Sequence, residues 1–180
     1  MRLFIALKID DVIANTIDMW QEENKVPGKR VKKENLHFTL CFLGERPESD
    51  LDSLKEILTY TLKDTKSFTI SLQGLGVLPR ITEPRVLYID VGKGKEALVN
   101  LAKQISQAIP FYEEKKPFKP HLTISRLKDY QEKPNLDNLW ERKDSYSFGS
   151  FKATEVILFS SDLRPSGPIY TPRAICPLVD

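Results

Sequence analysis

The sequence predicts an α+β fold built on antiparallel β-sheets. Many short β-prone runs alternate with turn residues and hairpin-like loops, whereas few segments show the apolar spacing of a helix. In addition, Arg2-Leu-Phe-Ile-Ala-Leu and Arg85-Val-Leu-Tyr-Ile-Asp echo one another. Each begins a predicted strand that is followed by a helix and then by a strand opening with histidine. This repeat predicts two β-α-β lobes related by a pseudo-two-fold axis around a shared cleft.

Each element follows from local pattern. Apolar, β-prone runs predict strands at residues 2–9, 36–43, 68–77, 85–91, 120–127, 147–151, 155–160 and 169–176. Asp10 and Asp11 suit the N-cap of a helix that continues to about Asn24. Apolar residues at helical spacing predict further helices at 51–64 and 95–109, and a short one at 134–143. Turn residues predict breaks at 27–28 and 92–94 and a loop over 78–84.

Length and composition limit the class of protein. The chain has 180 residues, of which 41% are hydrophobic and 29% charged, with a net charge of +2. These values are typical of one globular domain, so we expect residues 1–180 to form a single domain of two interleaved lobes. The N-terminal apolar run of five residues is too short for a signal peptide or a membrane span. We therefore expect a cytoplasmic monomer with no membrane or protein partner.

The two histidines of the chain share one local pattern. His37-Phe-Thr39-Leu and His121-Leu-Thr123-Ile both read histidine, apolar residue, threonine, apolar residue. With ten threonines in the chain, a chance match of both histidines has odds on the order of one in two thousand. Because side chains alternate along a strand, each histidine and its threonine should point to the same face. The apolar neighbours, Phe42 among them, should point into the core.

Such a pair of strands suits phosphodiester chemistry. A neutral imidazole can take a proton from an attacking water, and a protonated one can give a proton to the leaving oxygen. Threonine hydroxyls can donate hydrogen bonds to the phosphate oxygens as negative charge develops on them. We therefore predict that His37, Thr39, His121 and Thr123 face one catalytic pocket.

Other chemistries are less well supported. Two histidines supply too few nitrogen ligands for a typical catalytic zinc site, and no phosphate-cradling glycine loop is present in the sequence. We expect the enzyme to need no cofactor. Cys41 lies on the same strand as His37, so a cysteine nucleophile is conceivable, but a buried free thiol is the more usual role of such a residue. Cys41 and Cys176 are expected to be free thiols of a reducing compartment.

Basic residues precede each motif and suit a polyanion. Lysines and arginines gather before His37 (Lys29, Arg30, Lys32 and Lys33) and before His121 (Lys115, Lys116 and Lys119). The alternative is a solvated surface beside Glu34, Glu113 and Glu114. Aromatic side chains that could stack on a base are Phe118, Tyr130 and Tyr170, although any of them could instead belong to the core.

Around these motifs the chain resembles a known family. Paired His-x-Thr motifs are typical of the 2H phosphoesterase superfamily. Within it, the chain is similar to the RNA 2',3'-cyclic phosphodiesterase, or 2'-5' RNA ligase, family along nearly its whole length. The resemblance rests on Met1-Arg-Leu-Phe-Ile-Ala-Leu, Asn35-Leu-His-Phe-Thr-Leu-Cys-Phe-Leu-Gly-Glu45, Pro84-Arg-Val-Leu-Tyr88, Phe118-Lys-Pro-His-Leu-Thr-Ile-Ser-Arg126 and Ser161-Asp-Leu-Arg-Pro-Ser-Gly-Pro-Ile-Tyr170.

The resemblance implies a bilobal fold with two antiparallel sheets, flanked by helices, on either side of a central cleft. It implies metal-free hydrolysis of an RNA terminal 2',3'-cyclic phosphate to a 2'-phosphomonoester, with His37 as proton donor, His121 as proton acceptor and both threonines on the phosphate. Joining of RNA ends through a 2'-5' bond is the reverse activity of the family, and we expect hydrolysis to dominate in water. Arg126 matches a family arginine, but strict alternation places it on the face opposite to His121 unless the strand bends.

Contacts to RNA are expected from Arg30, Lys32, Lys119, Arg126, Phe118 and Tyr170. Two other functions stay open at this point. One is a 2H phosphodiesterase for small cyclic or 2'-5'-linked nucleotides, and the other is an RNA-binding module without catalysis.

Overall fold

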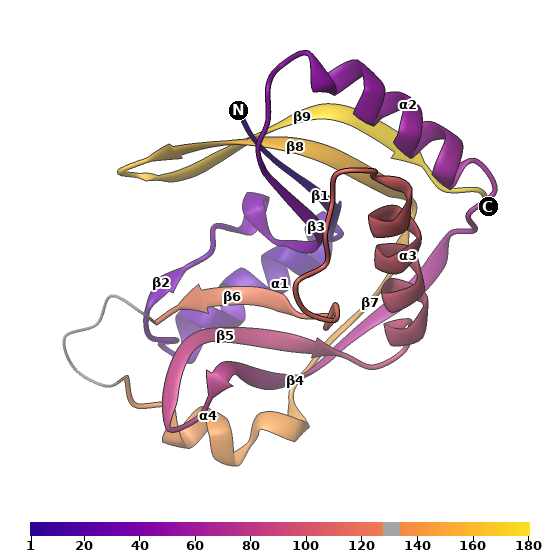
Figure 1. Ribbon diagram of the computed structural model, residues 1–180. Helices are drawn as coiled ribbons and strands as arrows, with labels where there is room; N and C mark the ends of the chain where they lie inside the picture. Colours follow the sequence, from indigo (N-terminus) through magenta and orange to yellow (C-terminus); the bar gives the residue numbers. More distant parts are fainter. Residues whose placement is uncertain (128–133) are drawn as a thin grey trace.

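The computed structural model describes residues 1–127 and 134–180, which form two antiparallel sheets (Figure 1). The four-stranded sheet has the order β3 (His37–Glu45), β1 (Arg2–Lys8), β8 (Glu155–Arg164), β9 (Gly167–Pro177). The five-stranded sheet has the order β2 (Lys29–Arg30), β6 (Leu122–Arg126), β5 (Glu83–Val91), β4 (Phe68–Arg80), β7 (Ser147–Ala153). The predicted α+β class with two antiparallel sheets is confirmed.

Helices flank the sheets and are exchanged between them. The helices are α1 (Asp11–Glu23), α2 (Asp50–Leu62), α3 (Lys95–Ala108) and the short α4 (Asp137–Glu141), with 3-10 turns at Lys33–Asn35 and Lys143–Ser145. In sequence α1 and β2 lie between β1 and β3 of the four-stranded sheet, and α1 packs on β7 of the other sheet, where Trp20 meets Phe148 edge to face at 5.0 Å. Likewise α3 connects β5 to β6 but packs on β3 and α2. The two lobes are therefore interleaved.

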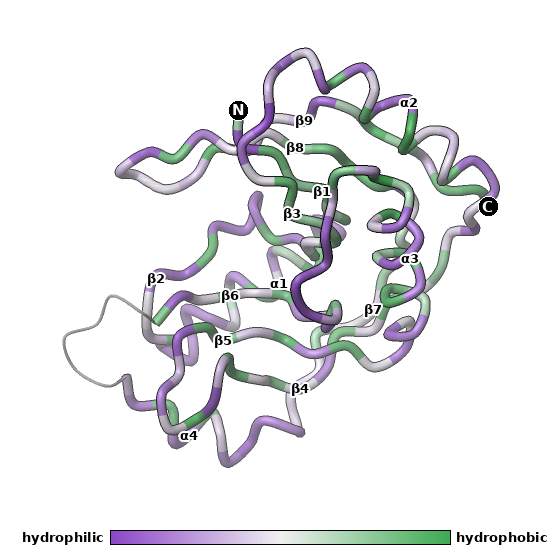
Figure 2. The backbone as a smooth tube through the Cα atoms, in the orientation of Figure 1, coloured by the Kyte–Doolittle hydropathy of each residue, from purple (hydrophilic) through white to green (hydrophobic). Residues whose placement is uncertain are grey.

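Local sequence explains why these helices begin and which faces they bury. The side chain of Asp10 caps α1 by accepting hydrogen bonds from the backbone N–H groups of Val12 and Ile13. The leucine stripe of α2, Leu54, Leu58 and Leu62, is fully buried as its spacing predicts. One cluster of buried apolar side chains runs through both sheets. Figure 2 shows the hydrophobic segments along β1, β3 and β8, with hydrophilic segments toward the loops.

The two lobes correspond in detail. Strand β1 pairs with β3, and β5 pairs with β6, so each echo strand lies beside the strand that carries its histidine motif. Both pairs contain a β-bulge at the same place. Thr39 and Cys41 oppose the consecutive residues Ala6 and Ile5, and Thr123 and Ser125 likewise oppose Tyr88 and Leu87. One extra residue therefore sits in β3 at Leu40 and one in β6 at Ile124, 84 positions apart.

Two expectations about the strands were wrong, and one short strand was missed. Phe42 does not join the core, since the bulge at Leu40 reverses the alternation and leaves Phe42 47% exposed. The loop predicted over 78–84 is mostly strand, because β4 and β5 form a hairpin in which Pro79 faces Pro84. Cross-strand pairing there outweighs the local turn signal of the prolines. Strand β2 was not predicted, and its pairing to β6 places Lys29 opposite Arg126.

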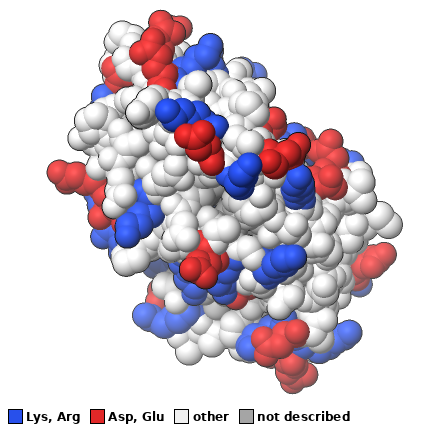
Figure 3. Space-filling view, turned by 90° about the vertical axis from the view of Figure 1, so that its right-hand side faces the viewer, with Lys and Arg blue, Asp and Glu red and all other residues white. Residues whose placement is uncertain are grey.

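The surface away from the cleft carries mixed charge. Figure 3 shows one face of the molecule, where lysines and arginines intermingle with aspartates and glutamates. This mixture agrees with the small net charge of +2. Among residues 1–127 and 134–180, none of the helices has the length and apolar character needed to cross a bilayer.

Candidate active site

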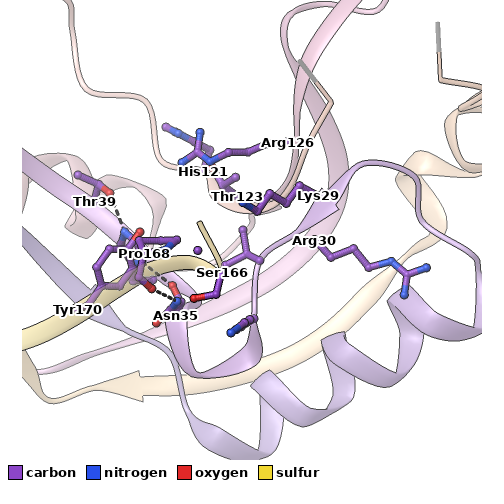
Figure 4. A pocket seen from close by; sticks show the side chains of 14 residues that line it. Lys29, Arg30, Asn35, Thr39, His121, Thr123, Arg126, Ser166, Pro168 and Tyr170 are labelled. Atoms are coloured by element: carbon purple, nitrogen blue, oxygen red, sulfur yellow. Dashed lines mark hydrogen bonds between the residues drawn. The ribbon is translucent and has the colours of Figure 1, made fainter. Parts of the chain in front are cut away.

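The two histidine motifs meet in one pocket between the sheets. His37 and Thr39 come from β3 of the four-stranded sheet, whereas Thr123 comes from β6 of the other sheet and His121 immediately precedes that strand. The cavity has a volume of about 160 Å³ (Figure 4). Its lining consists of Lys29, Arg30, Val31, Lys32, Asn35, His37, Thr39, His121, Thr123, Arg126, Ser166, Gly167, Pro168 and Tyr170. The predicted convergence of the four motif residues is therefore present.

Backbone contacts fix which nitrogen of His37 can titrate. Nδ1 of the imidazole lies 2.6 Å from the carbonyl oxygen of Asn35, and Nε2 lies 3.0 Å from Oγ1 of Thr39. Because a carbonyl oxygen only accepts hydrogen bonds, Nδ1 must carry a proton and donate it to Asn35. Nε2 is then the nitrogen that gains or loses a proton. In the neutral imidazole it accepts a hydrogen bond from the hydroxyl of Thr39.

His121 is held by an equivalent contact between its Nδ1 and a backbone carbonyl oxygen. Its Nδ1 lies 2.7 Å from the carbonyl oxygen of Lys119, again two residues earlier in the chain. Nδ1 of His121 therefore donates to this carbonyl oxygen, which leaves Nε2 as the nitrogen available to other partners. Each ring also contacts an aromatic side chain of the neighbouring strand, Phe4 for His37 at 5.2 Å between ring centroids and Tyr88 for His121 at 5.6 Å. The two imidazoles are presented to the pocket in matching ways.

The environment of His37 favours its neutral form. Burial lowers its pKa below the usual 6.5, and the positive charges of Arg126 and, less, of His121 act in the same direction. The hydrogen bond to Asn35 opposes these effects, because it stabilises the protonated ring. In the protein without substrate, His37 is therefore neutral at pH 7.

Arg126 reaches the pocket because β6 bends. Strict alternation would place its side chain on the face opposite to His121, but the bulge at Ile124 returns Arg126 to the face of the motif. Arg126 and His121 both line the pocket shown in Figure 4. The expectation drawn from alternation alone was thus wrong, and the match of Arg126 to the family pattern is consistent with its place in the site.

The remaining predicted RNA contacts separate into two groups. Lys32 and Tyr170 line the pocket, and Tyr170 meets the ring of His37 edge to face at 5.3 Å. Arg30 lines the pocket only in part, since its guanidinium pairs with Glu22 and points away from the cavity (Figure 4). The other two lie outside the lining: Phe118 is half-buried against the core, and Lys119 sits over the ring of Tyr88 at 5.6 Å.

The charged residues that precede the motifs are divided in the same way. Lys29 lines the pocket, whereas Lys33 bonds to Asn15, and Lys115 and Lys116 lie outside the lining. Tyr130, the third candidate for base stacking, falls outside the described residues.

The thiol of Cys41 is not suited to nucleophilic catalysis. The bulge at Leu40 turns Cys41 into the core, and both Cys41 and Cys176 are buried free thiols. Burial raises the pKa of the Cys41 thiol to about 12, so the thiolate is absent at neutral pH. Within the described residues, no three side chains of His, Cys, Asp or Glu lie close enough to hold a metal ion.

Two parts of the site were not found by sequence reasoning. Asn35 positions His37 through its carbonyl oxygen, and its side-chain Nδ2 donates a hydrogen bond to the carbonyl oxygen of Pro168 at 3.2 Å. This contact fixes the turn between β8 and β9, including Ser166, at the edge of the pocket. Both segments carry the family resemblance, which was the one available signal.

The chain is similar to known proteins in both sequence and fold. A family model described as the 2'-5' RNA ligase superfamily matches residues 9–165. A curated relative from Methanocaldococcus jannaschii, named RNA 2',3'-cyclic phosphodiesterase, is 38% identical over 94% of this chain and 96% of its own length. The crystal structure of TT0787 from Thermus thermophilus is 29% identical with a TM-score of 0.78, and that of E. coli LigT complexed with phosphate is 26% identical with a TM-score of 0.76. Each alignment covers 99% of this chain and 98% of the other.

Proposed function

The chain belongs to the 2'-5' RNA ligase superfamily, and from this membership we infer that it is a hydrolase that opens the 2',3'-cyclic phosphate at the end of an RNA chain. The relative from Methanocaldococcus jannaschii carries this activity in its name. The observation that supports the inference most directly is the pair of His-Thr motifs, one from each sheet, on one pocket.

We propose that the two histidines divide the proton transfers. Nε2 of His121 takes a proton from a water molecule as the water oxygen attacks the phosphorus. The bond between phosphorus and the ribose 3'-oxygen breaks, and Nε2–H of His37 protonates that oxygen. The products are a 2'-phosphomonoester and a 3'-hydroxyl. Thr39 and Thr123 donate hydrogen bonds to the non-bridging oxygens, and Arg126 offsets their charge.

Because the pKa of His37 is lowered in the free protein, the proposed mechanism requires the bound substrate to promote its protonation. A proton donor must be protonated before the reaction, whereas burial and Arg126 keep His37 neutral in the free protein. A bound phosphodiester brings a negative charge between these two groups, which raises the pKa of His37. Protonation of Nε2 also ends its acceptance of the Thr39 hydroxyl hydrogen. That hydrogen is then free to turn toward the phosphate.

Ligation follows from the same geometry. If a 5'-hydroxyl of a second RNA replaces water as the attacking group, the product is a 2'-5' phosphodiester. We propose that water outcompetes this hydroxyl under ordinary conditions.

We further propose that residues 1–180 act as one domain, because the exchange of α1 and α3 makes each sheet depend on a helix of the other lobe. A cytoplasmic location and a monomeric state stay predictions.

Product analysis tests the proposed function. An oligoribonucleotide ending in a 2',3'-cyclic phosphate should yield only the 2'-phosphomonoester. Turnover of cyclic or 2'-5'-linked mononucleotides with no turnover of the oligonucleotide would favour the small-nucleotide enzyme. Binding of RNA that persists with equal affinity after His37→Ala and His121→Ala, with no turnover by the unaltered protein, would favour a non-catalytic module.

A further inference from the structure

The active-site cleft continues past His37 into a second hollow of about 330 Å³. His37, Thr39, Arg126, Pro168 and Tyr170 border both cavities. The second one also has residues of its own, Arg2, Phe4, Phe42, Ser161 and Leu163, which we call the Arg2 subsite. It lies where β3, β1 and β8 run side by side, and Arg2 faces Ser161 across the strands.

The Arg2 subsite combines a cation with exposed apolar side chains. The guanidinium of Arg2 lies over the ring of Phe42, 4.9 Å from its centroid. Phe42 is 47% exposed and Leu163 is 63% exposed. The exposure of Phe42 follows from local structure, because the bulge at Leu40 turns its ring outward. An aromatic ring open to solvent beside a guanidinium has the chemistry to stack a base and bind a phosphate.

The carboxylates that neighbour Arg2 in the sheet are held by other cations. Glu45, opposite Arg2 on β3, pairs with the N-terminal ammonium. Within residues 1–127 and 134–180, no carboxylate lies within 4 Å of the Arg2 guanidinium, and neighbouring Asp162 pairs with Arg164 instead. Arg126 reinforces the positive charge from the other sheet. Although burial raises the pKa of Tyr170 overall, the positive charges of Arg126 and Arg2 both act on its hydroxyl in the opposite sense. The two arginines therefore act on the same part of the cleft.

A third hollow beside His37 lacks this character. It is lined by Lys8 and Lys32 but also by Glu34 and Glu155, so its positive and negative charges offset one another. A polyanion would gain little there. Of the two hollows that adjoin the catalytic pocket beside His37, the Arg2 subsite is therefore the one that favours phosphate charge.

We propose that the Arg2 subsite binds the RNA chain beyond its terminal nucleotide, with a base stacked on Phe42 and a backbone phosphate on Arg2. This inference rests on the proposed function, because the reacting cyclic phosphate must occupy the pocket of the two histidines. The enzyme then recognises an RNA end rather than a cyclic mononucleotide. The subsite contributes to binding and takes no part in the proton transfers.

Two substrates test the proposal. A nucleoside 2',3'-cyclic monophosphate fills only the catalytic pocket, whereas a short oligoribonucleotide with the same cyclic end also reaches the Arg2 subsite. Phe42→Ala and Arg2→Gln should each lower kcat/KM on the oligonucleotide about ten-fold, mainly through KM, because stacking and phosphate contacts are of this size. Activity on the mononucleotide should change less than about two-fold by the same reasoning. The Arg2 effect should shrink as salt is raised.

Matched variants control for the changes themselves. Phe111 is 40% exposed and lies under the guanidinium of Arg46, outside both cavities, so Phe111→Ala repeats the Phe42 change elsewhere. Arg85→Gln removes an exposed charge from the strand that corresponds to β1. Neither control variant should change kcat/KM on the oligonucleotide or on the mononucleotide. Leu163→Glu introduces a carboxylate at an exposed position and should weaken the oligonucleotide reaction, whereas Leu163→Gln should not.

The outcomes are distinct. If the unaltered protein hydrolyses neither substrate, the proposed function fails and the subsite with it. If it hydrolyses both, and Phe42→Ala, Arg2→Gln and Leu163→Glu leave the oligonucleotide reaction unchanged or weaken both reactions equally, the subsite alone is wrong. Melting temperatures of all variants show whether a loss reflects unfolding.

Discussion

Arg126 of the five-stranded sheet and His37 of the four-stranded sheet line the same cleft, and the positive charge of Arg126 disfavours protonation of the His37 imidazole. Burial is the larger cause of the lowered pKa of His37, and the positive charge of Arg126 adds to it. Arg126 reaches this cleft because a bulge in β6 returns its side chain to the face of the motif. The site therefore joins the two sheets electrostatically as well as by shape.

Replacing Arg126 tests this coupling. In Arg126→Gln we expect the pKa of His37 to rise toward its usual value, because a neighbouring positive charge no longer disfavours the imidazolium. NMR titration of the His37 ring measures the change. Arg85→Gln, which removes a charge outside the cleft, should leave the His37 titration where it was. An unchanged pKa in Arg126→Gln would show that the arginine does not act on this ring.

The stability of the protein should fall in mildly acidic solution because of His37. The pKa of His37 is lower in the folded protein than in the unfolded chain, where it is about 6.5. At pH values between the folded and the unfolded pKa, the unfolded chain therefore binds more protons than the folded protein. The free energy of unfolding should therefore decrease as pH falls below about 6.5. Urea unfolding at several pH values measures it. His37→Gln should lose this part of the slope, and an identical slope in both proteins would contradict the assignment.

Both histidines should be necessary for hydrolysis. His37→Ala and His121→Ala should each lose about 10²–10⁴-fold in kcat on the cyclic phosphate, the usual contribution of a proton-transfer group. Both rings are partly exposed in the cleft, so melting temperatures should change little. Near-full activity in either variant, with an unchanged melting curve, would remove that histidine from the mechanism.

The division into acid and base can be tested with an activated leaving group. Nitrophenolate leaves without needing a proton, whereas attack by water still needs a base. His37→Ala should therefore lose much less activity on a nitrophenyl phosphodiester than on the cyclic phosphate, and His121→Ala should be impaired on both. The measurement is kcat/KM for three proteins on two substrates. Rescue of His121→Ala instead would reverse the roles, and rescue of neither would contradict the acid–base division.

The proposed mechanism needs no metal ion or nucleotide. Hydrolysis should proceed at the same rate after dialysis against EDTA and with no ATP added, because each proton transfer is assigned to an imidazole. The assay compares initial rates with and without the chelator. Loss of activity in EDTA that one divalent ion restores would overturn the two-histidine mechanism.

The helices, most strands and the pairing of the two histidine motifs could be predicted from the sequence, because each depends on a pattern of residues close together in the chain. Apolar spacing located the helices, since a helix buries one face whatever it packs against. The repeated His-x-Thr pattern predicted that His37, Thr39, His121 and Thr123 line one pocket, because residues two positions apart on a strand point to the same face. The echo between Arg2 and Arg85 anticipated the corresponding positions of β1 and β5.

The tertiary structure decided what depends on partner strands. A bulge arises from the register between two strands. The exposure of Phe42 and the turn of Arg126 toward the cleft therefore cannot be predicted from the alternation of side chains along one strand. The pairing of β2 with β6 brings Lys29 to the site, and packing of the β8–β9 turn against Asn35 closes its edge. The Arg2 subsite likewise exists only because β1, β3 and β8 are neighbours, a contact between residues far apart in the chain.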